Sequence, residues 1–265
     1  MKTAIKLVLI YFLMQVLGAL VSGFFCLLYI YTTRGTMDMD QAKEIAMAPS
    51  MLLGFVFMAL YLWWKNYLPG NKRQYSPVPL SFSVWSVVGG FSLVFLVSVL
   101  VSQLTFLPNW LADTFNLLQS GWLGILCIAL LGPILEELLF RGAITKVLLE
   151  KYSPAKAILI SGLVFGIFHL NPAQVVNACF LGFFFAWLFY KTKSLIPGIL
   201  LHVLNNSFVV YMNLTHPEIE EMPDLTGDTG LIVWLVVFTL LLLLSLKKLN
   251  DYKISDINET TTTEV

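Results

Sequence analysis

The stretch LGPILEELLFRGAI, residues 131–144, places two adjacent glutamates and an arginine inside an otherwise apolar segment. In a lipid bilayer an ionisable side chain costs at least a few kcal/mol, and it usually faces a partner or a water-filled cavity. The fold and the function both depend on whether this segment lies in a membrane and on what Glu136, Glu137 and Arg141 do there.

The composition as a whole is that of a membrane protein. Of the 265 residues, 58% are hydrophobic and only 12% are charged, whereas a soluble globular protein has roughly half and a quarter. The formal net charge is zero, so no basic surface for nucleic acid is expected. The three cysteines lie in apolar runs without metal-ligand spacing, and we expect neither a disulfide framework nor a thiolate metal site.

Long apolar runs predict the fold class, an all-α, polytopic membrane helical bundle of about eight transmembrane helices. The expected spans are residues 5–31, 46–64, 84–107, 121–149, 155–170, 173–190, 195–213 and 230–246. Residues 108–120 are amphipathic and are expected to lie in the membrane interface. We interpret the phenylalanine-rich run 179–189 as lipid-facing, with Gly182 permitting a close helix contact.

Basic residues set the expected orientation. With the N-terminus inside, thirteen Lys and Arg residues lie on cytoplasmic segments, and only Arg34 and Lys43 lie on outer ones, as the positive-inside rule predicts. We therefore expect a multi-pass protein of a bacterial cell membrane with both termini in the cytoplasm. The chain then divides into N-terminal membrane helices with the interfacial segment (1–119), a catalytic helical core (120–213), an outer loop with the last span (214–248) and a disordered cytoplasmic tail (249–265).

The charged residues of the core fall into two sets. Glu137 and Arg141 are four residues apart, so they share a helix face and can neutralise each other. Glu136 points elsewhere around the helix and has no such local partner. Glu136 and His169 are equally far along the chain from a turn at 151–156. In an antiparallel hairpin this puts both at the same depth, ~25 Å from the turn, and we predict that they face each other.

A third polar element is formed by His202 and Asn206, which are again four residues apart on one helix face. Counting from the preceding loop leaves His202 shallower than His169, and tilt or a partly unwound helix would have to close this gap. We interpret Asn205 as a packing or capping amide.

Pro133 lies three residues before Glu136. Because proline has no N–H, it cannot donate to the carbonyl of Ala129, so the helix should kink or loosen at this point. A freed carbonyl and a bend beside a carboxylate suit a hydrated cavity.

The three polar motifs resemble those of the CAAX protease and bacteriocin-processing (CPBP or Abi) family of intramembrane proteases, which includes the type II CAAX prenyl endopeptidases. The stretches EELLFRG (136–142), FGIFH (165–169) and HVLNN (202–206) are similar to the family motifs EExxxR, FxxxH and HxxxN, in the same order and on separate spans. The resemblance covers roughly residues 120–213. It implies an endopeptidase in which Glu136 and His169 activate water, His202 and Asn206 stabilise the oxyanion, and Glu137 and Arg141 support the site.

The residues themselves fit this chemistry. Peptide hydrolysis needs a water, a base and charge stabilisation at the carbonyl oxygen, and these side chains can supply the base and the donors. The expected partners are a membrane-associated protein or peptide substrate and the lipid bilayer, with no cofactor required and no nucleic acid. Three alternatives stay open: a zinc-dependent protease with Glu136, His169 and His202 as ligands, a proton-coupled transporter, and a non-catalytic immunity or scaffold protein.

Overall fold

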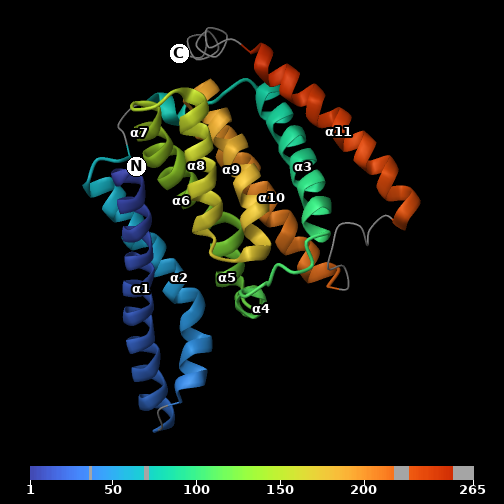
Figure 1. The fold of residues 1–265 in the computed structure, drawn as a ribbon. Coiled ribbons are helices and arrows are strands. Elements are labelled where there is room, and N and C mark those ends of the chain that lie inside the picture. Colours follow the sequence, from blue (N-terminus) through green and yellow to red (C-terminus); the bar gives the residue numbers. More distant parts are fainter. Residues whose placement is uncertain (36–37, 69–71, 218–226, 253–265) are drawn as a thin grey trace.

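The residues that the structure describes are mostly helical and contain no β-strand (Figure 1). The computed structural model describes residues 1–35, 38–68, 72–217 and 227–252. The all-α membrane bundle predicted from the sequence is confirmed. The longer helices are α1 (Lys2–Arg34), α2 (Met39–Trp64), α3 (Leu80–Ser102), α8 (Pro154–Phe168), α9 (Pro172–Thr192), α10 (Ile196–Thr215) and α11 (Gly227–Asp251).

One further span, Trp122–Leu149, is a continuous helix of 28 residues whose hydrogen-bond pattern changes along its length. Two π-helical stretches interrupt it, and such stretches are frequent at functional sites. Arg141 lies within the second stretch, and Glu136 and Glu137 lie directly before it. In chain order the parts are α5 (Trp122–Leu126), the π-helical η2 (Cys127–Leu131), α6 (Gly132–Glu137), the π-helical η3 (Leu138–Thr145) and α7 (Lys146–Leu149).

Within the described ranges, six helices are long and apolar enough to cross a membrane. The predicted spans 155–170 and 195–213 are helical but are not among these six. α8 has only 15 residues, which at 1.5 Å per residue is ~22 Å, against ~30 Å for the hydrocarbon core. α10 has 20 residues, but His202, Asn205 and Asn206 lower its hydropathy. α8 thus falls outside the six by its length, and α10 by its polar side chains.

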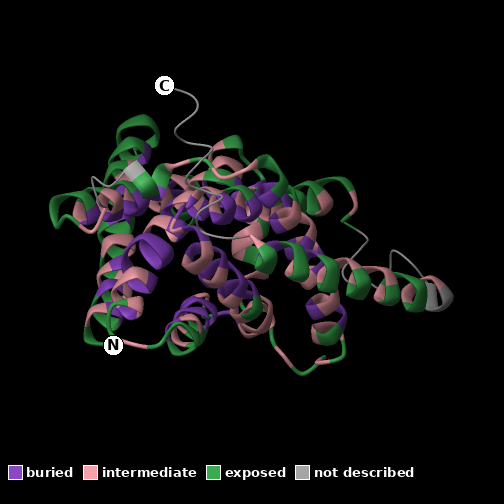
Figure 2. Cartoon of the chain, turned by 90° about the horizontal axis from the view of Figure 1, so that it is seen from above, coloured by how far each residue is buried: buried purple, intermediate pink, exposed green. Residues whose placement is uncertain are grey.

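The helices form three neighbouring groups (Figure 1). α1 packs along α2 at one side, α3 packs along α11 at the other, and α8 packs along α9 between them. Buried residues concentrate inside this arrangement, and exposed ones follow its periphery (Figure 2). Large apolar side chains such as Leu20 and Phe24 of α1 and Val233 and Leu240 of α11 are exposed. This is the surface that a lipid environment requires.

The contact between α8 and α9 depends on glycine. A Cβ atom at Gly182 would lie 2.9 Å from the Cα atom of Gly162, so the close approach predicted at Gly182 is confirmed. The lipid-facing interpretation of residues 179–189 is wrong, because Phe184 and Phe185 are buried. The physical reason is that α9 packs against α3, α8 and α10, which leaves it little surface for lipid.

Loops that carry many of the basic residues meet at one end of the bundle. The Leu195 N–H donates to the Gln74 carbonyl at 2.8 Å, and Lys191 Nζ donates to the Asn250 carbonyl at 2.8 Å. The first residues of α1 and the last residues of α11 lie toward this same end (Figure 1). An even number of membrane crossings produces this arrangement.

Two peripheral segments were also predicted. The amphipathic stretch 108–120 contains the short helix α4 (Ala112–Gln119). Of the tail predicted at 249–265, residues 249–251 belong to α11, and residues 253–265 lie outside the described part of the chain.

Candidate active site

The candidate site begins at an irregular turn of the Trp122–Leu149 span. In η2 the Gly132 N–H donates to the Cys127 carbonyl, five residues back. The next donor in this register would be Pro133, which has no N–H. The Ile128 carbonyl therefore loses its backbone donor, and α10 supplies a replacement. The Asn206 Nδ2 atom lies 3.1 Å from the Ile128 oxygen.

The α-helical spacing assumed from the sequence had placed the freed carbonyl at Ala129. The π-helical register moves it by one residue, to Ile128. Asn205, expected to be a packing or capping amide, donates from Nδ2 to Asn206 Oδ1 at 3.2 Å. Both ends of the Asn206 amide are thus fixed, because its oxygen accepts from Asn205 and its nitrogen donates to Ile128.

The predicted ion pair of Glu137 and Arg141 is present and almost completely buried. Arg141 Nη1 lies 2.7 Å from Glu137 Oε1, and the side chains are 1% and 0% exposed. Arg141 Nη2 also donates to the Gly182 carbonyl of α9 at 3.2 Å. The guanidinium carbon lies 4.3 Å from the Phe165 ring centroid and 4.8 Å from that of Phe185. Arg141 therefore holds the Trp122–Leu149 span to both α8 and α9.

Glu137 has a second partner that sequence reasoning missed. His202 Nδ1 lies 3.0 Å from Glu137 Oε1, its Nε2 lies 3.8 Å from Glu136 Oε2, and its ring stacks on Phe185. Because a carboxylate oxygen accepts, Nδ1 donates and the imidazole turns Nε2 toward Glu136. Gly198, one turn before His202, leaves space for this approach: a Cβ atom there would lie 2.7 Å from Glu137 Oε2. The only signal for this in the sequence was the four-residue spacing from Gly198 to His202.

His169 caps the C-terminal end of α8, half-buried beside the same carboxylates. Its Nδ1 lies 2.9 Å from the Phe165 carbonyl oxygen. Since that oxygen can only accept, Nδ1 carries the hydrogen, and Nε2 presents a lone pair when the ring is neutral. The His169 and His202 rings both contact the Phe165 ring, with centroids 4.9 and 5.8 Å from it. This shared contact closes the depth gap expected between the two histidines, whereas the facing of Glu136 and His169 stays a prediction.

His202 and Asn206 share one face of α10, as predicted, but their side chains have different partners. The His202 ring is turned to Glu136 and Glu137, whereas the Asn206 amide is turned to Ile128. In this structure the two do not share a common acceptor. The bond to Ile128 uses one of the two Asn206 amide hydrogens, which leaves the second for another acceptor.

The zinc alternative requires Glu136, His169 and His202 to converge on one point. Among the described residues, no group of three or more His, Cys, Asp or Glu side chains is arranged to hold a metal ion.

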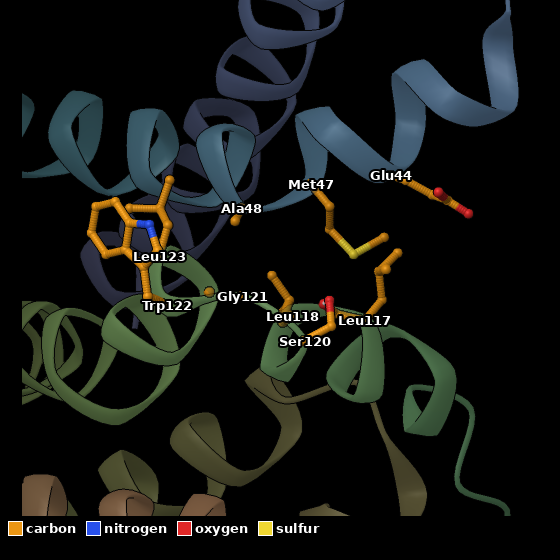
Figure 3. A pocket seen from close by; sticks show the side chains of 10 residues that line it. Glu44, Met47, Ala48, Leu117, Leu118, Ser120, Gly121, Trp122 and Leu123 are labelled. Carbon is orange, nitrogen blue, oxygen red and sulfur yellow. The ribbon is translucent and has the colours of Figure 1, made fainter. Parts of the chain in front are cut away.

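A pocket of about 160 Å³ lies away from these residues, between α2 and the segment that contains α4 and α5 (Figure 3). Glu44, Met47 and Ala48 line one wall, and residues within 117–124 line the other. Leu118 packs with Ile128 in a small apolar cluster, so the pocket adjoins the helix that carries the site. None of the predicted catalytic side chains lines it.

Replacing Glu137 by glutamine should strongly destabilise the protein. The buried Arg141 charge would lose its counter-charge, and breaking a buried ion pair costs about 3–5 kcal/mol. We expect a clearly lower unfolding temperature in detergent micelles, followed by intrinsic fluorescence. The matched control is Asp40→Asn, which removes the exposed pair with Lys43 and should change little. Equal unfolding temperatures for the two variants would contradict the structural role of Glu137.

Comparisons with known proteins match the part of the chain that carries the polar motifs. Residues 118–208 match the family described as "Type II CAAX prenyl endopeptidase Rce1-like". The "Putative membrane peptidase YdiL" of Bacillus subtilis (strain 168) is 38% identical over 99 residues, which cover 37% of this chain and 41% of that protein. The "Membrane-embedded CAAX protease MroQ" of Staphylococcus aureus (strain USA300) is 32% identical over 101 residues, which cover 36% of this chain and 40% of that protein.

The matches thus span about two fifths of the length of these relatives. No solved structure matches the chain significantly. The matched segment contains all three polar motifs. Residues 118–208 are therefore similar to the family of type II CAAX prenyl endopeptidases that the Rce1-like description names.

Proposed function

We propose that this chain is an intramembrane endopeptidase that hydrolyses a peptide bond of a membrane-associated protein or peptide. The observation that carries the proposal is the approach of His202 to Glu136 inside an apolar helical bundle, with the His169 and His202 rings both packed on Phe165. Glu136 and His169 are both partly exposed, so water can reach them. The family of the matched segment and the names of the two relatives point to the same activity.

The first step is attack by water on the carbonyl carbon of the substrate. Glu136 accepts a proton from the water, and the free Nε2 lone pair of His169 accepts its second hydrogen bond, which orients it. A bond forms from the water oxygen to the carbon, and the carbonyl becomes a tetrahedral oxyanion. Glu136 then passes its proton to the leaving nitrogen as the C–N bond breaks.

The oxyanion needs hydrogen-bond donors placed before the reaction begins. The second amide hydrogen of Asn206 is one donor, and its direction is set by the bonds to Asn205 and Ile128. His202 Nε2 is the other when both ring nitrogens carry hydrogen. In that form the positive charges of His202 and Arg141 balance the negative charges of Glu136 and Glu137. Glu137 then acts on the reaction through His202, beyond its pairing with Arg141.

The test of this function is Glu136→Gln. The amide keeps the size of the side chain but cannot accept the proton, and loss of a general base typically lowers turnover about 10²–10⁴-fold. The purified protein in micelles would be screened with a library of internally quenched apolar peptides, read by fluorescence and mass spectrometry. Glu44→Gln, on the exposed rim of the separate pocket, is the matched control and should cleave normally. Near-normal turnover in the Glu136 variant would remove the basis of the proposal.

Cleavage should not depend on a metal ion. Asn206 lies one turn after His202, and an amide suits an oxyanion better than zinc. We expect unchanged rates after incubation with EDTA or 1,10-phenanthroline. Activity that is lost on chelation and returns with added zinc would instead assign Glu136, His169 and His202 as ligands.

The orientation follows from the distribution of basic residues. Both termini lie on the cytoplasmic side of a bacterial cell membrane, because loops rich in Lys and Arg gather at the end of the bundle where α1 begins and α11 ends. Reporter fusions at Lys253 and at Asp224 should therefore report opposite sides, with Lys253 inside. Two fusions reporting the same side would show that the predicted span between them does not cross the membrane and that the span count is wrong.

A further inference from the structure

The short turn that follows His169 holds one residue in an unusual backbone conformation. Leu170 connects His169 to Asn171, the N-cap residue of α9, and has a φ of 54° although it is not a glycine. This left-handed conformation is disfavoured for a residue with a side chain. The Leu170 side chain is 57% exposed, so its own packing does little to hold it. Such strain persists where the surrounding structure imposes it, and it gathers at functional sites.

The hydrogen bonds that hold this turn come from the segment before α4. Asn171 is fully buried, and its Oδ1 accepts from the Trp110 N–H at 3.0 Å. Its Nδ2 donates to Asn109 Oδ1 at 2.8 Å. The Ala173 N–H donates to the Pro108 carbonyl at 3.3 Å. These bonds join the segment before α4 to the turn between α8 and α9, at one end of the bundle (Figure 1).

Asn171 differs in its bonding from an ordinary N-cap asparagine. The side chain at this position normally accepts from the N–H of the second or third residue of its own helix, but the Asn171 side chain makes no such bond. The second residue, Ala173, donates to Pro108 instead. Both ends of the Asn171 amide are thus used to bind the neighbouring segment, and the side chain serves the turn rather than α9.

The conformation of this turn sets the direction of the His169 ring. The His169 N–H donates to the Gly166 carbonyl, three residues back, at 3.1 Å. The Leu170 N–H donates in the same way to Ile167, also at 3.1 Å, so the last turn of α8 is tightened. The Phe165 carbonyl, four residues before His169, accepts from the ring at Nδ1, at 2.9 Å. This bond keeps the hydrogen on Nδ1 and leaves Nε2 with the lone pair that the proposed mechanism uses.

We propose that Asn171 is a positioning residue for His169. By joining the turn to residues 108–110, its amide holds Leu170 in the left-handed conformation and thereby fixes the His169 ring. The inference rests on the proposed function for its catalytic meaning. It also extends the functional unit beyond residues 118–208, because the partners of the amide precede the family-matched segment. The competing explanation is that Asn171 serves only to fasten residues 108–110 to the bundle.

Nuclear magnetic resonance tests the positioning without any substrate. The chain has three histidines, so isotopically labelled histidine gives three sets of ring signals in micelles, and His169→Gln identifies those of His169. At about pH 8 the nitrogen shifts report which nitrogen of a neutral ring carries the hydrogen. Wild type should carry it on Nδ1 of His169. Asn171→Ala should move part of it to Nε2 and leave the His202 signals in place, which a mere loss of fastening would not do. An unchanged His169 ring in a folded Asn171→Ala protein overturns the proposal.

A second variant decides the question where Asn171→Ala does not fold. Asn109 is exposed, so Asn109→Ala removes one partner of the Asn171 amide at a place that water can reach. The His169 hydrogen should redistribute in the same direction but to a smaller extent. The matched control is Asn213→Ala, which removes an exposed asparagine of α10 and should leave all ring signals unchanged. A His169 ring that stays wholly in the Nδ1 form in Asn109→Ala then overturns the proposal.

Kinetics test the consequence, with the library peptide that the wild-type protein cleaves fastest. A displacement of about 1 Å can lower turnover about 10²-fold, and a turned His169 ring orients the water poorly. In Asn171→Ala we therefore expect kcat to fall about ten- to a hundredfold with KM nearly unchanged. A normal kcat there, beside an inactive Glu136→Gln, would overturn this inference and leave the proposed function intact. If wild type cleaves no peptide, the proposed function fails and the ring signals alone decide.

Discussion

The structure is organised around one buried carboxylate. Glu137 Oε1 accepts from both Arg141 and His202, at 2.7 and 3.0 Å, with the carboxylate fully shielded from solvent. Charges at membrane depth are tolerated only when they are paired, so every element that touches this carboxylate is constrained by it. α9 contributes the Gly182 carbonyl and the Phe185 ring to Arg141. α10 contributes His202, together with a glycine that leaves the space for its partner.

The irregular backbone of the fourth predicted span, residues 121–149, follows from the same need to pair polar groups inside the membrane. Within a bilayer each backbone carbonyl has to find a donor inside the protein. Pro133 removes one, and the Asn206 amide replaces it at Ile128. The hydrogen bond that satisfies the Ile128 carbonyl therefore also fixes Asn206 beside the carboxylates. Packing and chemistry are coupled here, because a regular helix would not have required an amide at this position.

Sequence periodicity predicted the contacts that lie within one helix or across one hairpin. The four-residue spacing predicted the pair of Glu137 and Arg141. The equal distances of Glu136 and His169 from the turn at 151–156 predicted that both lie at the same depth. The contact between Glu137 and His202 joins residues 65 apart, and no local pattern encodes such a distance. The burial of Phe185 was missed for the same reason, since apolar side chains look alike whether they face lipid or other helices. The hydrogen-bond register of η2 was not predicted either, because it depends on Asn206, a partner from α10.

Exposure separates the side chains that hold the site from those that can meet a substrate. Glu137 and Arg141 are sealed, and the side chain of His202 is only 5% exposed, whereas that of Glu136 is 17% exposed. His169 and Asn206 are partly exposed as well. A base has to reach water, whereas a charge that orients other groups acts most strongly where water is excluded. Adjacent residues on one helix thus meet opposite requirements because they differ in burial: the Glu137 carboxylate is enclosed by Arg141 and by His202 of α10, whereas the Glu136 side chain keeps part of its surface exposed.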